Sequence, residues 1–241
     1  MAQAVSLVES EKAKFVTKTY LWMGVALLLS AISAFFTAIS IFDGNELSSF
    51  GKFLFGGASI GFWIFAVAEI ALVWGLSAAI RKISLQTAIL GFLAYSVING
   101  ITLSSIFIVY EIESIVIAFF GTSAMFFVMA FYGATTKKNL ATAGRYLMMA
   151  LIGVIIVSLL EFVMARFFAL KTGPLDFLIS IATIIIFTGL TAYDSQKVMK
   201  IASHSNGSED YQKVSLIAAL ELYLDFINLF LTLLRLFGKR K

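Results

Sequence analysis

The sequence of 241 residues contains no cysteine, one proline and one histidine, and charged residues make up only 13% of it. Without cysteine the chain forms neither disulfides nor thiolate metal sites, and it has no cysteine nucleophile. The single histidine, His204, cannot form a cluster of imidazoles around a metal ion. Soluble chains average about 25% charged residues, so this chain has too few charges to cover a water-facing surface.

What the sequence has instead is apolar side chains. Residues of the set AVILMFWYC make up 60% of it, against about 45–50% in an average soluble chain. We therefore expect an integral membrane protein whose main partner is the lipid bilayer. The formal net charge of +4 does not indicate nucleic-acid binding, because the lysines and arginines fall in short segments between apolar runs, where such residues orient membrane proteins.

A helix that crosses a bilayer needs about 20 mainly apolar residues, and seven segments of the chain meet that length. These segments are 20–42, 53–80, 85–110, 114–133, 146–168, 175–199 and 215–237. Barrel strands would alternate over about 10 residues, so the predicted fold is an all-α integral membrane bundle. In the second segment, Gly57 and Gly61 form a GxxxG spacing that is typical of close helix packing.

The predicted organisation is a cytosolic amino-terminal segment (1–19), a seven-helix membrane domain (20–237) and a basic tail (238–241). The first apolar run exceeds the 7–15 or so residues of a secretory signal, so we expect it to remain as a helix. Eleven lysines and arginines lie on the amino-terminal side and three in the opposite loops. This imbalance places the amino terminus in the cytoplasm.

The basic residues at the end of the chain conflict with this count. If segment 215–237 spans the membrane, Arg235, Lys239, Arg240 and Lys241 lie outside. A segment that enters and leaves on the cytoplasmic side would instead keep them inside. We favour the full span because the segment is long enough to cross a bilayer.

Five carboxylates interrupt the apolar segments: Glu69, Glu161, Asp194, Glu221 and Asp225. On insertion scales a charged side chain at the centre of a membrane helix costs about 2.5–3.5 kcal/mol, so such residues face protein or water and are candidates for function. Of the five, Glu69 and Glu221 are candidates for a cation pathway. Glu161 has no evident partner.

Two of the segments carry a polar stripe at steps of three and four residues, which is the spacing of one helix face. The stripes consist of Thr188, Thr191, Asp194 and Ser195 in the sixth segment, and of Glu221, Asp225, Asn228, Thr232 and Arg235 in the seventh. In a membrane such stripes face the bundle interior, so we expect Asp194 and Asp225 to meet. Two carboxyls in contact in a low-dielectric interior must share one proton or one cation.

A shared proton would tie the two helices together, and its loss would replace a hydrogen bond with repulsion and open a negatively lined path. Hard divalent cations prefer oxygen ligands. The residues thus predict a pH-gated cation leak that favours calcium, which would bind only transiently at Asp194 and Asp225, with no resident metal or cofactor. The simpler alternative is that each aspartate only caps backbone or bonds a neighbouring threonine.

Five motifs, in order along nearly the whole chain, closely resemble the Bax inhibitor-1 family. They are AEIALVWGLS (68–77), GITLSSIF (100–107), YGATTK (132–137), FTGLTAYDSQK (187–197) and LYLDFINLF (222–230). The chain length and compact loops are similar to a bacterial member, which implies the inner membrane as its location.

The resemblance implies six helices around a central seventh and a pH-sensitive calcium leak, closed by a two-aspartate latch between the last two helices. By motif, the latch residues correspond to Asp194 and Asp225, and an acidic residue of the second helix corresponds to Glu69. The family also has an arginine near the end of that helix that can bond a latch aspartate. Arg81 matches this position only loosely.

Two other classes of function compete with the leak. The chain could be a non-conducting regulator that binds other membrane proteins, such as proteases or channels. An enzyme is disfavoured because the sequence has no serine–histidine or metal-ligand constellation. An intramembrane aspartyl protease would need a glycine-rich aspartate motif, whereas Asp194 follows Ala192 and Tyr193.

Overall fold

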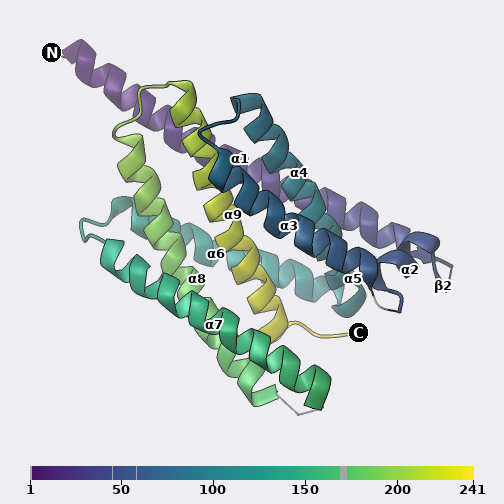
Figure 1. The fold of residues 1–241 in the computed structure, drawn as a ribbon. Coiled ribbons are helices and arrows are strands. Elements are labelled where there is room, and N and C mark those ends of the chain that lie inside the picture. The colour runs from purple at the N-terminus through teal and green to yellow at the C-terminus, as the bar shows by residue number, and fades with distance from the viewer. Residues whose placement is uncertain (1, 45, 58, 169–172) are drawn as a thin grey trace. The chain divides into compact units, whose positions relative to one another are not determined.

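The computed structural model describes residues 2–44, 46–57, 59–168 and 173–241, and these residues form nine helices and one short hairpin (Figure 1). Seven spans are long and apolar enough to cross a membrane. They are formed by α1 (Ala2–Ser40), α3 (Ile60–Ala79), α4 (Leu85–Leu103) together with α5 (Ser105–Val109), α6 (Ile112–Thr135), α7 (Ala141–Phe168), α8 (Gly173–Ala202) and α9 (Glu209–Phe237). The predicted all-α class and the seven spans are confirmed.

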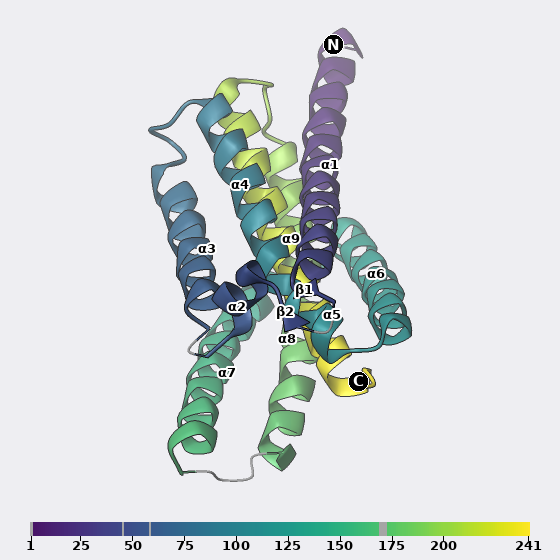
Figure 2. The same cartoon turned by 90° about the vertical axis from the view of Figure 1, so that its right-hand side faces the viewer.

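The first helix is longer than its apolar run. α1 continues without a break from Ala2 to Ser40 (Figure 2), so the expected boundary between residues 19 and 20 lies inside one helix. The amino-terminal segment is therefore a helical extension of the first span. Its position in the cytosol stays a prediction.

The chain divides into two compact units, and the first comprises residues 1–110, 202–223 and 240–241. In it α1 and α4 lie side by side (Figures 1 and 2). Ser30 Oγ donates to the carbonyl of Ser96 at 2.7 Å. A Cβ atom at Gly100 would lie 2.5 Å from the Ser30 carbonyl oxygen. Small residues thus allow the two backbones to approach closely.

The predicted second segment, 53–80, is two helices instead of one. After the hairpin of β1 (Phe42–Asp43) and β2 (Glu46–Leu47), the short α2 (Ser49–Phe55) ends before α3 begins. Gly57 and Ser59 between them have φ of +49° and +50°, a left-handed conformation that interrupts a helix. The GxxxG interpretation of Gly57 and Gly61 is therefore wrong, because Gly57 is not helical. Gly61 instead makes room for the Phe53 ring of α2.

The second unit comprises residues 111–201 and 224–239, so it contains α6, α7, nearly all of α8 and the second half of α9. Its apolar core joins Ile186, Phe187 and Leu190 of α8 to Leu229 and Leu233 of α9. From α6, the rings of Phe119 and Phe126 meet Phe226 edge to face, at centroid distances of 5.6 and 5.7 Å. These contacts fix α9 against both α6 and α8.

α9 is the most buried of the seven spans. Buried residues make up 67% of its apolar stretch, compared with 0% in the span of α7. The helix also contributes to both compact units, with its first half in one and its second half in the other. The expectation that the seventh segment is enclosed by protein is confirmed by this burial.

The two ends of α9 lie at opposite ends of the third span. At its start, Glu209 Oε1 accepts the backbone N–H of Leu85, the first residue of α4, at 3.1 Å. Beyond its end, the backbone N–H of Lys241 donates to the carbonyl of Val109, the last residue of α5, at 3.0 Å. α9 therefore runs the full length of that span, which favours the full crossing over the re-entrant alternative.

Candidate functional site

The polar stripe of α8 faces the protein interior. Thr191 and Ser195 are fully buried, and Asp194 between them is half-buried. The Thr191 hydroxyl donates to the carbonyl of Phe187, one turn earlier, at 2.8 Å. Its proton is thus committed to its own helix, as is common for threonine within helices.

The stripe of α9 is buried over its middle part. Asp225 is only 4% exposed and Thr232 is 7% exposed. Asn228 Nδ2 donates to the Leu224 carbonyl at 2.8 Å, and the Thr232 hydroxyl donates to the Asn228 carbonyl at 2.6 Å. Toward the end of the helix the stripe leaves the interior, and the exposed Arg235 pairs with Asp176 of α8 at 3.4 Å.

Close backbone packing fixes the part of α8 that precedes Asp194. A Cβ atom at Gly133 of α6 would lie 2.0 Å from the Ala192 carbonyl oxygen, so only glycine allows α6 to approach this closely. Gly144 of α7 faces the Tyr193 ring in the same way, with 2.5 Å between a built Cβ and the ring. Two neighbouring helices thus hold the residues immediately before Asp194.

The part of α8 that follows Asp194 is held by a buried amide. Gln196 Oε1 accepts the Leu140 N–H at 2.9 Å, and Gln196 Nε2 donates to the Lys138 carbonyl at 2.7 Å. Lys200 Nζ adds a bond to Asn139 Oδ1 at 2.8 Å. These bonds tie α8 to the turn between α6 and α7, so Asp194 lies on a stretch that is fixed on both sides.

Asp194 and Asp225 therefore belong to one compact unit, on two helices that share an apolar core. Each of them has interaction partners in the structure. Direct contact between their two carboxyl groups stays a prediction. Among the described residues, no group of three or more histidine, aspartate or glutamate side chains is placed to hold a metal ion.

A second polar site surrounds Glu69, in the first unit. Glu69 Oε2 accepts a bond from Asn99 Nδ2 at 3.1 Å, and Glu69 Oε1 lies 2.5 Å from the Thr102 hydroxyl. Both partners come from α4, whereas Glu69 is half-buried in α3. Within the described part of the chain, no lysine or arginine lies within ion-pair distance of Glu69.

The bonds continue from Glu69 into α9 and α1. The Tyr223 hydroxyl of α9 donates to Asn99 Oδ1 at 2.7 Å and lies 2.6 Å from Ser30 Oγ of α1. Tyr223 is fully buried, and the Tyr95 ring meets its ring edge to face at 5.7 Å. A chain of hydrogen bonds therefore links Glu69 to α4 and α9, and the contact of Tyr223 with Ser30 brings α1 beside it.

Proton counting at Thr102 indicates which form of Glu69 completes this network. The Thr102 hydroxyl contacts both Glu69 Oε1 and the Asn99 carbonyl oxygen, the latter at 2.9 Å, but it has only one proton to donate. If Glu69 is protonated, it donates to Thr102, and Thr102 donates to the carbonyl. Both contacts are then hydrogen bonds, so the geometry suits the neutral acid better than the carboxylate.

Three further candidates from the sequence are Glu221, Glu161 and Arg81. Glu221 is half-buried on α9 and has an interaction partner, and Glu161 is half-buried on α7. Arg81 is exposed in the turn between α3 and α4. Its role as a partner of a latch aspartate stays a prediction.

The sequence analysis did not identify Asn99, Thr102 or Tyr223 as functional residues. Asn99 and Thr102 are three residues apart, hence on one face of α4, and their side-chain donors match the need of a carboxylate buried in another helix. Their spacing was the one feature of the sequence that could have identified them as partners of a buried carboxylate. Tyr223 gave none, because its position two residues before Asp225 places it on a different face of α9.

Comparison with known proteins shows matches over almost the whole chain. Residues 12–241 match the family described as "Inhibitor of apoptosis-promoting Bax1". "Inner membrane protein YbhL" of Escherichia coli (strain K12) is 41% identical over 229 residues, which cover 94% of this chain and 92% of the relative. An uncharacterized protein of Borreliella burgdorferi is also 41% identical, over 95% of this chain and 94% of its own length. "Uncharacterized protein YrjE" of Lactococcus lactis is 35% identical, over 93% of this chain and 90% of its own length.

Proposed function

The chain belongs to the Bax inhibitor-1 family of membrane proteins, and we propose that it is a pH-sensitive leak for cations, with calcium as the favoured ion. The observation that carries the proposal is the pair of acidic residues on adjacent helices of one unit. Asp225 is buried on α9, and Asp194 lies on the fixed stretch of α8. Ionised carboxylates in a membrane interior are characteristic of ion pathways and proton relays.

In the proposed mechanism the two carboxyls form the latch. With one proton shared between them, a hydrogen bond holds α8 and α9 together and the path is closed. When that proton leaves, two negative charges repel each other across a low-dielectric interior. The helices then separate, so the cation flux rises with increasing pH.

The preference for calcium follows from the kinds of ligand in the chain. With no cysteine and one histidine, the sequence offers almost only oxygen ligands, which hard divalent cations prefer. No group of three acidic or histidine side chains forms a metal site within the described residues. Two carboxylates and a few hydroxyls would bind calcium weakly, which suits an ion that passes through.

Glu69 and Glu221, both in the first unit, are the further acids that we assign to the pathway. Glu69 is a half-buried acid whose partners there are an amide and a hydroxyl. An arriving cation would displace its proton and take the carboxylate as a ligand. Glu221 lies one helical turn before Asp225 on α9, which places the two carboxyls on one face of that helix.

We place the protein in the inner membrane of a bacterium, with its amino terminus in the cytoplasm. The Escherichia coli relative is named as an inner membrane protein. If α9 spans fully, the side opposite the amino terminus carries the three loop residues plus the four basic residues near the end of the chain, seven against eleven. The excess still favours a cytoplasmic amino terminus.

Calcium flux into liposomes that contain only the purified protein tests the proposal. We expect wild-type flux to rise with pH, and both Asp194→Asn and Asp225→Asn to hold it near the low-pH level at every pH. An asparagine amide can donate to the remaining carboxylate without a shared proton, so the latch would stay closed. Asp43→Asn is the control, because Asp43 is an exposed acid of the β1–β2 hairpin, outside both α8 and α9.

Two outcomes would contradict the proposal. If the wild-type protein alone carries no flux at any pH, it is not a leak, and a regulator that acts on other membrane proteins becomes the better interpretation. If both aspartate variants keep the wild-type flux and pH dependence, the latch is excluded even though a leak exists.

A further inference from the structure

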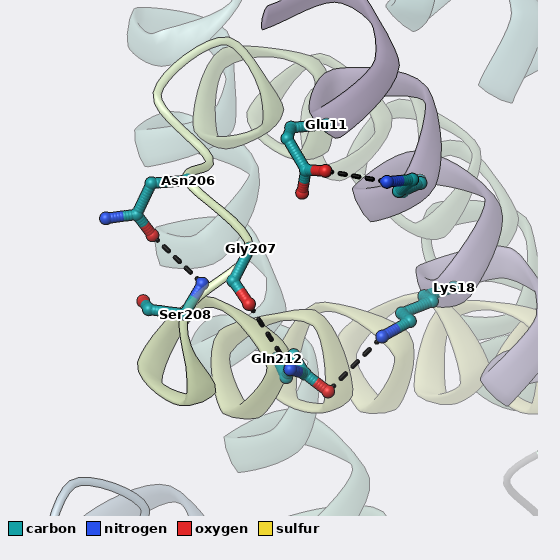
Figure 3. A network of polar contacts seen from close by, with 7 residues as sticks. Glu11, Lys18, Asn206, Gly207, Ser208 and Gln212 are labelled. Carbon is teal, nitrogen blue, oxygen red and sulfur yellow. Dashed lines mark hydrogen bonds and ion pairs between the residues drawn. The ribbon is translucent and has the colours of Figure 1, made fainter. Parts of the chain in front are cut away.

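A polar pocket of about 380 Å³ lies in the first unit. α1 contributes Glu11, Lys14 and Lys18 to its wall, and the loop between α8 and α9 contributes Ser205 and Asn206. The first turns of α9 complete it (Figure 3). Its volume is in the range of small-molecule sites, about 300–1,000 Å³.

The hydrogen-bond acceptors of this pocket are largely occupied from within the protein. Gln212 Oε1 accepts from Lys18 Nζ at 3.2 Å, and Asn206 Oδ1 accepts from the backbone N–H of Ser208 at 3.0 Å (Figure 3). Glu11 Oε1 accepts from Lys14 Nζ at 2.8 Å, whereas Glu11 Oε2 faces Gly207 and accepts no bond from the described residues. A ligand would therefore find few acceptors available to it.

The donors, in contrast, are available. The hydroxyls of Ser205 and Tyr211 and the amide nitrogen of Asn206 make no hydrogen bond with other described residues. The bond to Oδ1 orients the Asn206 side chain, and its nitrogen points away from Glu11 and Lys18 (Figure 3), so the donors left for a ligand are the two hydroxyls and Lys18. Lys18 uses one of its three protons on Gln212. An excess of donors over acceptors is what an oxyanion requires.

The charge of the pocket is also suited to an anion. Lys14 and Glu11 form an ion pair, which leaves the charge of Lys18 balanced by no carboxylate among the described residues. The Glu11 carboxylate also lines the pocket and opposes anion binding. Counting all three residues, the lining has one positive charge in excess, enough for one singly charged anion.

We propose that this pocket binds a phosphate group, either in the head group of a phospholipid or in a soluble phosphate ester. A phosphate offers several acceptor oxygens in a tetrahedral arrangement, which matches donors that come from both a helix and a loop. Lys18 lies just before the apolar run that begins at residue 20, so the pocket is at the level of the lipid head groups. Lysines at this level attract anionic lipids.

The test uses the full-length protein in maltoside detergent, freed of lipid. The thermal unfolding midpoint is measured while the ligand is titrated, because a ligand that binds only the folded state raises the midpoint. One arm adds sn-glycerol 3-phosphate as the soluble ester. The other compares phosphatidylglycerol with diacylglycerol of the same chains, which lacks only the phosphate-containing head group.

We expect phosphatidylglycerol or glycerol phosphate to raise the midpoint and diacylglycerol to leave it unchanged. Lys18→Gln should weaken the apparent affinity about tenfold, the usual effect of losing a charge-assisted hydrogen bond. Lys82→Gln, which removes a charge from the exposed turn between α3 and α4, should leave it unchanged. Tyr211→Phe removes only a hydroxyl and should weaken binding about threefold.

The two arms of the test distinguish a lipid head group from a soluble phosphate ester as the ligand. A response to the lipid alone assigns the pocket to head groups, and a response to glycerol phosphate as well assigns it to phosphate groups in general. The proposal is overturned if neither phosphate compound shifts the midpoint of a folded wild-type protein. It is also overturned if Lys82→Gln weakens binding as much as Lys18→Gln, because attraction to the whole basic surface would then be the cause.

Discussion

At the scale of single residues, the protein keeps acidic groups in its interior in two different ways. Asp194 and Asp225 lie on helices that share an apolar core. Glu69 is surrounded by neutral donors from a neighbouring helix. Burial without a lysine or arginine beside it favours the neutral form of Glu69.

Replacement of Glu69 distinguishes its neutral acid from its carboxylate. Glu69→Gln mimics the neutral acid, because the glutamine oxygen can accept from Asn99 and its amide can donate to Thr102. We expect the free energy of unfolding to change by less than about 1 kcal/mol, whereas calcium flux should fall because the charged ligand is lost. Chemical denaturation in detergent and liposome flux measure the two effects.

Glu69→Ala is the contrasting variant for the same site. It leaves the Asn99 amide and the Thr102 hydroxyl without their acceptor, which costs about 1–3 kcal/mol. If Glu69→Gln were as destabilising as Glu69→Ala, the site would require the carboxylate, and the assignment of a neutral acid would be wrong.

Tyr223 gives a second prediction at this scale. Tyr223→Phe keeps the ring packing against Tyr95 but leaves Asn99 Oδ1 without its donor in a buried position. We expect a loss of about 1–2 kcal/mol in the free energy of unfolding. Tyr95→Phe is the control, because it removes a tyrosine hydroxyl from the same cluster. If Tyr95→Phe lost as much unfolding free energy as Tyr223→Phe, the bond from Tyr223 to Asn99 would not be the cause of the loss.

At the scale of helices, glycines decide how closely the elements approach. Gly133 allows α6 to contact the backbone of α8 just before Asp194, and Gly100 allows α4 to contact α1. The sequence pattern indicated neither contact. It pointed instead to Gly57 and Gly61, because a GxxxG spacing marks a helix face only if all its residues are helical, and the left-handed Gly57 is not.

Gly133→Ala is therefore expected to be disruptive. The new methyl would overlap the Ala192 carbonyl, so α6 and α8 must move apart, at a cost of about 1–3 kcal/mol for overpacking. Gly153→Ala on α7 is the matched control, because nothing lies within 4 Å of a Cβ built there, and alanine is the better helix former by about 1 kcal/mol. Thermal unfolding of both variants in detergent should shift in opposite directions, and equal shifts would refute the close contact.

At the scale of the whole molecule, composition and the length of the apolar runs predict the seven spans. They do not predict which helices contact one another. Apolar runs of sufficient length predicted all seven, and the stripe on 215–237 predicted that this helix is buried. The partners of Glu69 could not be predicted, because helical spacing identifies one face of one helix but not which other helix that face meets. The break before α3 was missed as well, because the residues around it remain apolar.

The path of α9 makes a prediction about topology, and the lack of cysteine makes it simple to test. Single cysteines at Ser205, before α9, and at Lys239, after it, would be the only thiols of the chain. A maleimide that cannot cross the membrane should label Ser205→Cys from the cytoplasmic side and Lys239→Cys from the opposite side. Labelling of both from one side would restore the re-entrant alternative.

The unbroken course of α1 has a mechanical consequence. At 1.5 Å per residue its 39 residues form a rod about 58 Å long, nearly twice the hydrocarbon thickness of about 30 Å. Lys18 in the phosphate pocket and Ser30 beside Tyr223 lie on this rod, separated by about 18 Å at the same rise per residue. A tilt of α1 at its head-group end would therefore also move the Ser30 hydroxyl beside Tyr223, so in the proposed leak the cation flux would depend on the surrounding lipid.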